Sequence, residues 1–280
     1  MVSDRYILLE RKVHPMNEMK QKIISRLQEI EEKEKVRILY ACESGSRAWG
    51  FPSVDSDYDV RFIYLRPVEG YLSIKKMRDV IEYAINDQLD IDGWDLQKAL
   101  LLLRKSNPPL MEWLGSPIIY LEKYSIAAQM RTLVSQYYSA TANAYHYLHM
   151  AKRNYRDYLK GESVWLKKYF YVLRPILAVQ WVAQGMGIVP TDFNVLVERL
   201  VTDTNLKKEI VALIEAKRQG EELDYGPRIT PISDFLEQEL HRFEQYKIDL
   251  EKHSAPIDKL DKIFFSALKE VWAYSSPNPV

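Results

Sequence analysis

The first half of the chain contains short apolar runs separated by polar turns, which is the pattern of strands in a sheet. Residues 38–42 and 79–85 are runs of this kind, and another begins near Asp57 and ends before Pro67. A helix predicted over residues 17–35 carries its apolar residues on one stripe, so we expect it to cover one face of the sheet.

Beyond residue 125 the apolar positions follow helical spacing almost to the end, and no further strand is predicted. Glycine and proline mark the breaks between the helices. The helices are expected at residues 125–138, 140–159, 164–184, 192–201, 206–219, 232–252 and 257–273. We therefore predict an α+β protein with a mixed-sheet domain at residues 1–122 and an all-α domain at residues 123–280.

Composition narrows the class of protein. The 280 residues are 47% hydrophobic, which is enough for a packed core. Lys+Arg and Asp+Glu are both 39, so the formal net charge is zero and any contact with nucleic acid must come from a local patch. The one cysteine, Cys42, lies in the first predicted strand, which excludes an internal disulfide or a cysteine zinc cluster.

No segment has the pattern of a signal peptide or a membrane span. Residues 1–16 carry scattered charges without an apolar block. The longest apolar run, residues 169–189, is interrupted by Arg174, Pro175, Gln180 and Gln184, as in a buried helix. We expect a soluble, cytoplasmic protein with no membrane partner.

A pair of acidic residues begins the second predicted strand. Alternate side chains share a face of a strand, so we expect Asp57 and Asp59 on one face and Tyr58, Val60 and Phe62 on the other. Two neighbouring carboxylates repel each other, and one takes up a proton unless a cation lies between them. Mg²⁺ removes this conflict because it prefers carboxylates together with substrate phosphates. We therefore predict that Asp57 and Asp59 bind Mg²⁺, or Mn²⁺ in its place.

A turn at Gly45-Ser46 follows the first predicted strand. Glycine lets the backbone approach a phosphate closely, and successive backbone N–H groups form an anion-binding nest. Ser46 adds a hydroxyl and Arg47 a fixed positive charge. We predict that Gly45, Ser46 and Arg47 bind the phosphates of a nucleotide. The alternative is that this segment, rich in serine and aspartate, only forms turns and helix caps.

Metal-assisted phosphoryl transfer also uses a carboxylate from a neighbouring strand. Residues 88–96 offer Asp90 and Asp92 on one strand face, and Asp95 just before a helix predicted at residues 96–105. An aspartate at that position suits a helix N-cap. Asp90 is the first choice for the third catalytic and metal-binding carboxylate, while Asp92 and Asp95 stay open.

These motifs, in this order, resemble a known superfamily. Gly45-Ser46, a loop and then Asp57-Tyr58-Asp59-Val60 resemble the signature of the DNA polymerase β-type nucleotidyltransferases. The wider segment, residues 44–64 (SGSRAWGFPSVDSDYDVRFIY), resembles the YcgL/RlaP-like branch of predicted nucleotidyltransferases. The resemblance continues through residues 93–120 and 167–175 (KKYFYVLRP), and covers most of the chain to about residue 182.

The resemblance implies a polymerase β-like sheet domain and the transfer of a nucleoside monophosphate from a nucleoside triphosphate to an acceptor hydroxyl, with release of pyrophosphate. It also implies three further nucleotide-binding candidates. Lys98 lies within the second similar segment, Lys168 lies within the third, and Lys152 belongs to a neighbouring basic and aromatic patch. Basic residues interleaved with aromatics bind polyphosphates, but they are also typical of an amphipathic helix hairpin with a solvated face.

The acceptor stays open among an RNA end, a small-molecule hydroxyl and a protein side chain, and the association of the similar family with RNA repair favours RNA. A second hypothesis is a nucleotide-sensing or partner-binding module that keeps the fold without turnover. A third is a metal-dependent phosphodiesterase, which shares the metal site but does not need the Gly-Ser turn.

Overall fold

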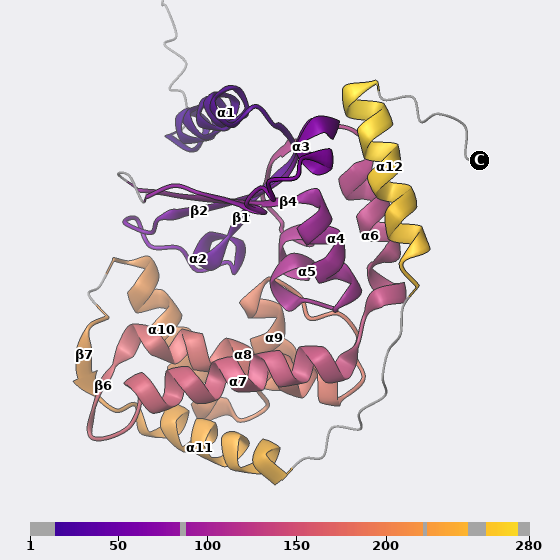
Figure 1. The fold of residues 1–280 in the computed structure, drawn as a ribbon. Helices are drawn as coiled ribbons and strands as arrows, with labels where there is room; N and C mark the ends of the chain where they lie inside the picture. Colours follow the sequence, from indigo (N-terminus) through magenta and orange to yellow (C-terminus); the bar gives the residue numbers. More distant parts are fainter. Residues whose placement is uncertain (1–14, 85–87, 221–222, 246–255, 274–280) are drawn as a thin grey trace, which may run out of the picture.

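The structure is a computed structural model that describes residues 15–84, 88–220, 223–245 and 256–273 (Figure 1). A sheet with helices on both faces forms one half, and a bundle of helices lies beneath it (Figure 1). The predicted α+β class, with a mixed sheet followed by a helical region, is confirmed.

The main sheet has five strands in the order β3-β4-β2-β1-β5. Strand β2 pairs with β1 in antiparallel fashion and with β4 in parallel fashion, so the sheet is mixed. The strand bounds are Arg37–Ser44 for β1, Tyr58–Leu65 for β2, Val80–Glu82 for β3, Leu89–Asp95 for β4 and Ile119–Glu122 for β5.

The two faces of this sheet pack against different helices, as the alternating side chains of β2 require. Val60, Phe62 and Tyr64 share a core with helix α1, Pro15–Glu34. Ile63 shares a second core with helices on the opposite face. These are α4 (Leu96–Arg104), α5 (Pro108–Leu114), α6 (Ile126–Tyr137) and α12 (Asp258–Trp272).

The helices from α7 to α11 share a third core, and we call this part, residues 140–245, the helical half. Its helices are α7 (Ala140–Tyr158), α8 (Phe170–Ala183), α9 (Phe193–Leu200), α10 (Thr204–Arg218) and α11 (Thr230–Gln245). No helix in the described part of the chain is long and apolar enough to cross a membrane.

One predicted helix begins later than expected. Within residues 164–184, the first residues form strand β6 (Ser163–Trp165) and a short 3₁₀ helix (Leu166–Tyr169), and α8 begins only at Phe170. Strand β6 pairs with β7, Tyr225–Pro227, in a small second sheet. The prediction of no further strand was therefore wrong, because this pairing joins segments about sixty residues apart that carry no local signal.

The packing also bears on where the boundary between the two predicted domains lies. Helices α6 and α12 lie side by side against the sheet half, although they fall after residue 122 (Figure 1). The division of the chain at residue 122 stays a prediction, and the cores show that helices from both ends of the second segment complete the packing of the first.

Two buried contacts join the halves. Phe51, in the loop before β2, inserts into the helical core and stacks on Phe170 with ring centroids 4.5 Å apart. Arg174 of α8 is fully buried and forms an ion pair with Glu112 of α5 at 2.9 Å, and its guanidinium lies over the Trp49 ring. Arg174 is therefore an interior residue, and its buried charge is compensated by Glu112 rather than by solvent.

We predict that Phe51→Ala lowers the free energy of unfolding by about 3–5 kcal/mol, because it leaves a large cavity in the helical core. Chemical denaturation of the full chain measures this change. Phe265→Ala is the matched control, since that ring is 55% exposed and its loss should change stability by no more than about 0.5 kcal/mol. A wild-type midpoint for Phe51→Ala would show that the ring does not anchor the loop.

Candidate active site

The candidate site forms where β1 ends and β2 begins. Strand β1 leads directly into the short helix α2, Gly45–Ala48, and loop 49–57 returns the chain to β2. Ser44 is the Cα partner of Asp59 in the antiparallel pair, so the Gly-Ser turn lies beside the acidic pair.

Gly45 cannot be replaced without disturbing Asp59. Its φ is +63°, in the left-handed region that favours glycine. A Cβ on Gly45 would lie 2.0 Å from the Oδ2 atom of Asp59. The Asp59 carboxylate therefore packs directly on the glycine, which explains why the two motifs occur together.

A residue that the sequence analysis missed holds Asp59 from the other side. Glu43 is fully buried, and its carboxylate accepts a hydrogen bond of 2.8 Å from the backbone N–H of Asp59. The Tyr120 hydroxyl donates to the same carboxylate. Burial raises the pKa of Glu43 to about 7, against the lowering effect of these two hydrogen bonds. A charged residue inside a buried strand was the available sequence signal.

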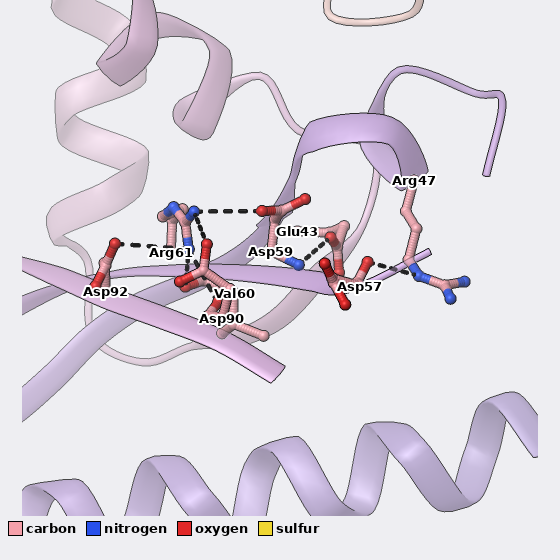
Figure 2. Close-up of polar contacts among 8 residues, drawn as sticks. All are labelled: Glu43, Arg47, Asp57, Asp59, Val60, Arg61, Asp90 and Asp92. Carbon is pink, nitrogen blue, oxygen red and sulfur yellow. Dashed lines mark hydrogen bonds and ion pairs between the residues drawn. The ribbon is translucent and has the colours of Figure 1, made fainter. Parts of the chain in front are cut away.

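Arg61 is the centre of an acidic cluster on the same face of the sheet (Figure 2). Its Nη2 atom lies 2.7 Å from Asp90 Oδ2 and 3.3 Å from Asp59 Oδ1, and its Nη1 atom lies 3.9 Å from Asp92 Oδ2. Asp57 lies apart from this guanidinium, beside Arg47 (Figure 2). The predicted acids thus gather at one edge, but an arginine that the sequence analysis did not single out compensates part of their charge.

Burial raises the pKa of Asp59 to about 6. Arg61 opposes this shift, and the neighbouring charges of Asp90 and Asp57 add to it. Arg61 therefore does not neutralise the cluster completely, and Asp59 remains in a place that favours an additional positive charge.

The three candidates for the third carboxylate occupy different places along β4. Asp90 is the Cα partner of Asp59 in the parallel pair β2–β4, whereas Asp92 lies two residues further along, opposite Arg61. Asp95 is buried at the other end of the strand. It caps α4 by accepting from the Gln97 N–H at 2.8 Å. The parallel register thus favours Asp90 and gives Asp95 a structural role.

A cavity of about 430 Å³ lies between the acidic edge and the helical half. From loop 49–57 and its flanks, Ser46, Asp57 and Asp59 line it. From the helical half, the residues on its wall include Trp165, Lys167, Tyr171 and Lys217. A backbone hydrogen bond of 3.0 Å from the Phe193 N–H to the Trp49 carbonyl connects the loop to the helical half.

Lys217 of α10 is the second residue that the sequence analysis missed. Its side chain is buried and reaches the cavity from the helical half. Burial and, to a smaller extent, the charge of Lys167 lower the pKa of Lys217 to about 8, against the raising effect of Asp59. Its position at the end of a long helix, far from the motifs in sequence, gave no signal.

The remaining predicted nucleotide-binding residues are spread over the molecule. The Arg47 guanidinium donates to the backbone carbonyls of residues 56 and 57, at the rim of the site. Lys168 does not line the cavity, but its ammonium lies against three rings, two of which do: Tyr158, Trp165 and Tyr171.

Two predicted lysines are not brought to the cavity. Lys98 lies after the far end of β4 and pairs with Asp79 at 3.2 Å. Lys152 of α7 pairs with Glu244 of α11 at 3.3 Å. Gly45, Ser46, Asp57, Asp59 and Asp90 are the predicted residues that the fold gathers around one place.

Comparison with known proteins identifies the family. A family model described as RlaP, RNA repair pathway DNA polymerase beta family, matches residues 19–266. The chain belongs to this family. An uncharacterised protein, YcgL of Bacillus subtilis (strain 168), is 51% identical over 255 residues, which cover 91% of this chain and 98% of that protein.

A crystal structure of a nucleotidyltransferase-like protein from Exiguobacterium sibiricum 255-15 is similar at 12% identity, with a TM-score of 0.32. The match covers 94% of this chain and 96% of that chain. At this TM-score the likeness adds nothing to the assignment of residues.

Whether a divalent ion fits this member of the RlaP family depends on the oxygen donors. Among the described residues, no group of three or more His, Cys, Asp or Glu side chains converges into a complete metal site. Mg²⁺ does not need one, because it is typically held by one or two carboxylates together with substrate phosphates and water. The raised pKa of Asp59 and the cavity beside Asp57 and Asp59 fit such an ion, whereas Asp90 is held by Arg61.

The raised pKa of Asp59 predicts how this RlaP-family protein responds to pH. Its stabilising contribution is complete below the ordinary pKa of about 4 and is lost as the pH rises through about 6. Asp59→Asn should therefore be more stable than the wild type at pH 7.5 in metal-free buffer, with the difference shrinking as the pH falls towards 4.

Denaturation midpoints across this pH range measure the effect, with Glu32→Gln on the exposed side of α1 as the control. An equal or lower stability of Asp59→Asn at pH 7.5 would mean that Arg61 already neutralises the cluster.

Proposed function

We propose that the protein is a Mg²⁺-dependent nucleotidyltransferase, with Mn²⁺ as a substitute ion, that moves a nucleoside monophosphate from a nucleoside triphosphate to an acceptor hydroxyl. Family membership points to a function of the nucleotidyltransferase type. The observation that carries the proposal is the cavity that joins Asp57, Asp59 and Ser46 to Lys217. Acidic ligands for a metal and donors for phosphate thus face the same space from two sides.

The phosphate chain is assigned to the Gly45-Ser46 turn and Lys217. The first N–H groups of a helix have no partner within the helix, and α2 begins at Gly45, so the turn and the Ser46 hydroxyl supply hydrogen-bond donors. Lys217 and Lys167 on the opposite wall supply positive charge for the departing pyrophosphate. Arg47 and Lys168 support this arrangement from the rim.

In the proposed reaction the oxygen of the acceptor hydroxyl attacks the α-phosphorus, and the bond from that phosphorus to the bridging oxygen of the β-phosphate breaks. Asp57 and Asp59 would hold the divalent ion, which would neutralise charge on the phosphate oxygens. Asp90, opposite Asp59 in the sheet, is assigned to accept the proton of the hydroxyl after release from Arg61. If Asp90 instead joins the metal ligands, water in the cavity takes that proton. Pyrophosphate leaves along the lysine wall.

One observation favours the alternative, a nucleotide-sensing or partner-binding module without turnover. Arg61 binds both Asp59 and Asp90, and a guanidinium that stayed there would block the third carboxylate. The two hypotheses differ in product. Incubation with each labelled nucleoside triphosphate, Mg²⁺ or Mn²⁺, and a panel of RNA, small-molecule and protein acceptors yields labelled acceptor and pyrophosphate only if the enzyme hypothesis holds.

We expect Asp57→Ala and Asp59→Ala each to lower Mg²⁺-dependent transfer by at least about a hundredfold while the circular dichroism spectrum stays that of the wild type. Each loses a charged ligand for the ion at the reacting phosphate. Glu32→Ala, on the exposed side of α1, serves as the control and should transfer at the wild-type rate. Turnover of either aspartate variant at the wild-type rate would refute the proposal.

Lys217→Met should lower kcat/KM for the nucleoside triphosphate by about 10- to 150-fold, because a charge-assisted hydrogen bond to phosphate contributes about 1.5–3 kcal/mol. The same substitution at Lys208, an exposed residue of the same helix, is the matched control. An equal effect in both variants would point to general charge rather than to a contact in the cavity.

A further inference from the structure

The small two-stranded sheet β6–β7, which the sequence analysis missed, carries two stacked aromatic rings. Trp165 of β6 and Tyr225 of β7 are Cα partners in the antiparallel pair. Their ring centroids lie 6.0 Å apart with an interplanar angle of 20°, so the rings are nearly parallel. The β6–β7 sheet therefore presents an aromatic stack rather than two unrelated side chains.

This stack runs from the cavity to the surface. Trp165 lines the same cavity as Asp57 and Asp59, whereas Tyr225 is 66% exposed and is not among the residues of the cavity wall. One member of the stack thus faces the reacting centre and the other faces solvent. A ligand that extends from the cavity past Trp165 meets Tyr225 next.

Positive charge accompanies the two rings. Lys167 is exposed and lines the cavity two residues after Trp165. The Lys168 ammonium lies 4.8 Å from the centroid of the Trp165 ring. Lys217 lies on the same wall, and Asp224 is the acid there. Aromatic rings combined with lysines are the combination that binds single-stranded nucleic acid, because bases stack on the rings while the lysines follow the phosphates.

We propose that the acceptor is the hydroxyl end of a single-stranded polynucleotide, and that the Trp165–Tyr225 stack is the platform on which its last bases lie. This inference rests on the proposed function for the reaction, but the binding surface is independent of turnover. A small-molecule acceptor has no use for the exposed ring of Tyr225. A blunt duplex keeps its bases paired and stacked on one another, so it presents no free base to the Trp165–Tyr225 stack.

Binding of a fluorescein-labelled oligoadenylate of about ten nucleotides, a length within the range of single-strand sites, tests the platform by fluorescence anisotropy. The full chain is used without nucleoside triphosphate or divalent ion, so the result does not depend on transfer. Oligoadenylate and oligodeoxyadenylate are compared with a blunt RNA duplex of the same length. Binding of either single strand more tightly than the duplex supports the proposal.

Substitution of the exposed Tyr225 tests most directly whether a base stacks on this ring. Tyr225→Ala and Tyr225→Leu should each weaken binding of the single strand by about 5- to 150-fold, the range expected for one stacked base. Tyr225→Trp should keep it, because a ring remains for stacking. Tyr145→Ala, at a tyrosine of α7 that is 40% exposed, is the control and should bind as the wild type does.

Several results overturn the proposal: no binding of either single strand by the wild type, equal binding of the duplex, or undiminished binding by Tyr225→Ala. Equal loss in Tyr225→Leu and Tyr225→Trp also overturns it, since stacking then plays no part. A protein that binds the single strand through Tyr225 yet transfers no nucleotide would refute the proposed function and leave the platform standing.

Discussion

The insertion of Phe51 into the helical core is the contact on which the candidate site depends. Loop 49–57 separates the Gly-Ser turn from the acidic pair, and a loop of this length has no fixed course of its own. Two contacts fix the course of this loop: the stacking of Phe51 on Phe170, and the backbone hydrogen bond from the Phe193 N–H to the Trp49 carbonyl. The same contact brings the lysine wall of the helical half opposite the carboxylates, so the cavity exists because the loop is anchored.

Electrostatics then determines what the cavity can bind. Asp59 lies between a buried glutamate and the charges of Asp57 and Asp90, and Arg61 offsets only part of this negative charge. On the opposite wall, burial holds the pKa of Lys217 below its usual range. Each wall thus carries charge that its own surroundings do not fully satisfy. The proposed ligand, a metal-bound triphosphate, would offer a cation to one wall and phosphates to the other.

Sequence patterns predicted the structure correctly where it depends on the local alternation of side chains along a strand. The alternation of β2 placed Asp57 and Asp59 on one face and Val60 and Phe62 on the other, and the cores confirm that division. Asp90 was already the first choice from the sequence, and the register of β4 against β2 adds a geometric reason, because Asp90 is the Cα partner of Asp59.

Sequence patterns did not predict the place of a residue where that place depends on a contact between segments far apart in the sequence. Glu43 looks like the polar end of a strand, yet it holds the Asp59 backbone. Lys217 looks like one of many helical lysines. Lys98 lies in a segment similar to the family signature, but it is in helix α4, beyond the end of β4 that is far from the cavity. The β6–β7 pairing was missed because a 3₁₀ helix and the α-helices α8, α9 and α10 lie between its two strands in the sequence.

The buried ion pair of Arg174 with Glu112 has a consequence for how such a chain can be recombined. Arg174 belongs to the helical half and is fully buried, while its counterion belongs to a helix beside the sheet. A helical half grafted onto a foreign sheet would carry an uncompensated interior cation, which costs several kcal/mol in real proteins. The two halves are therefore not interchangeable modules. When halves are exchanged between relatives, the chimera must contain both the arginine and the glutamate of this ion pair.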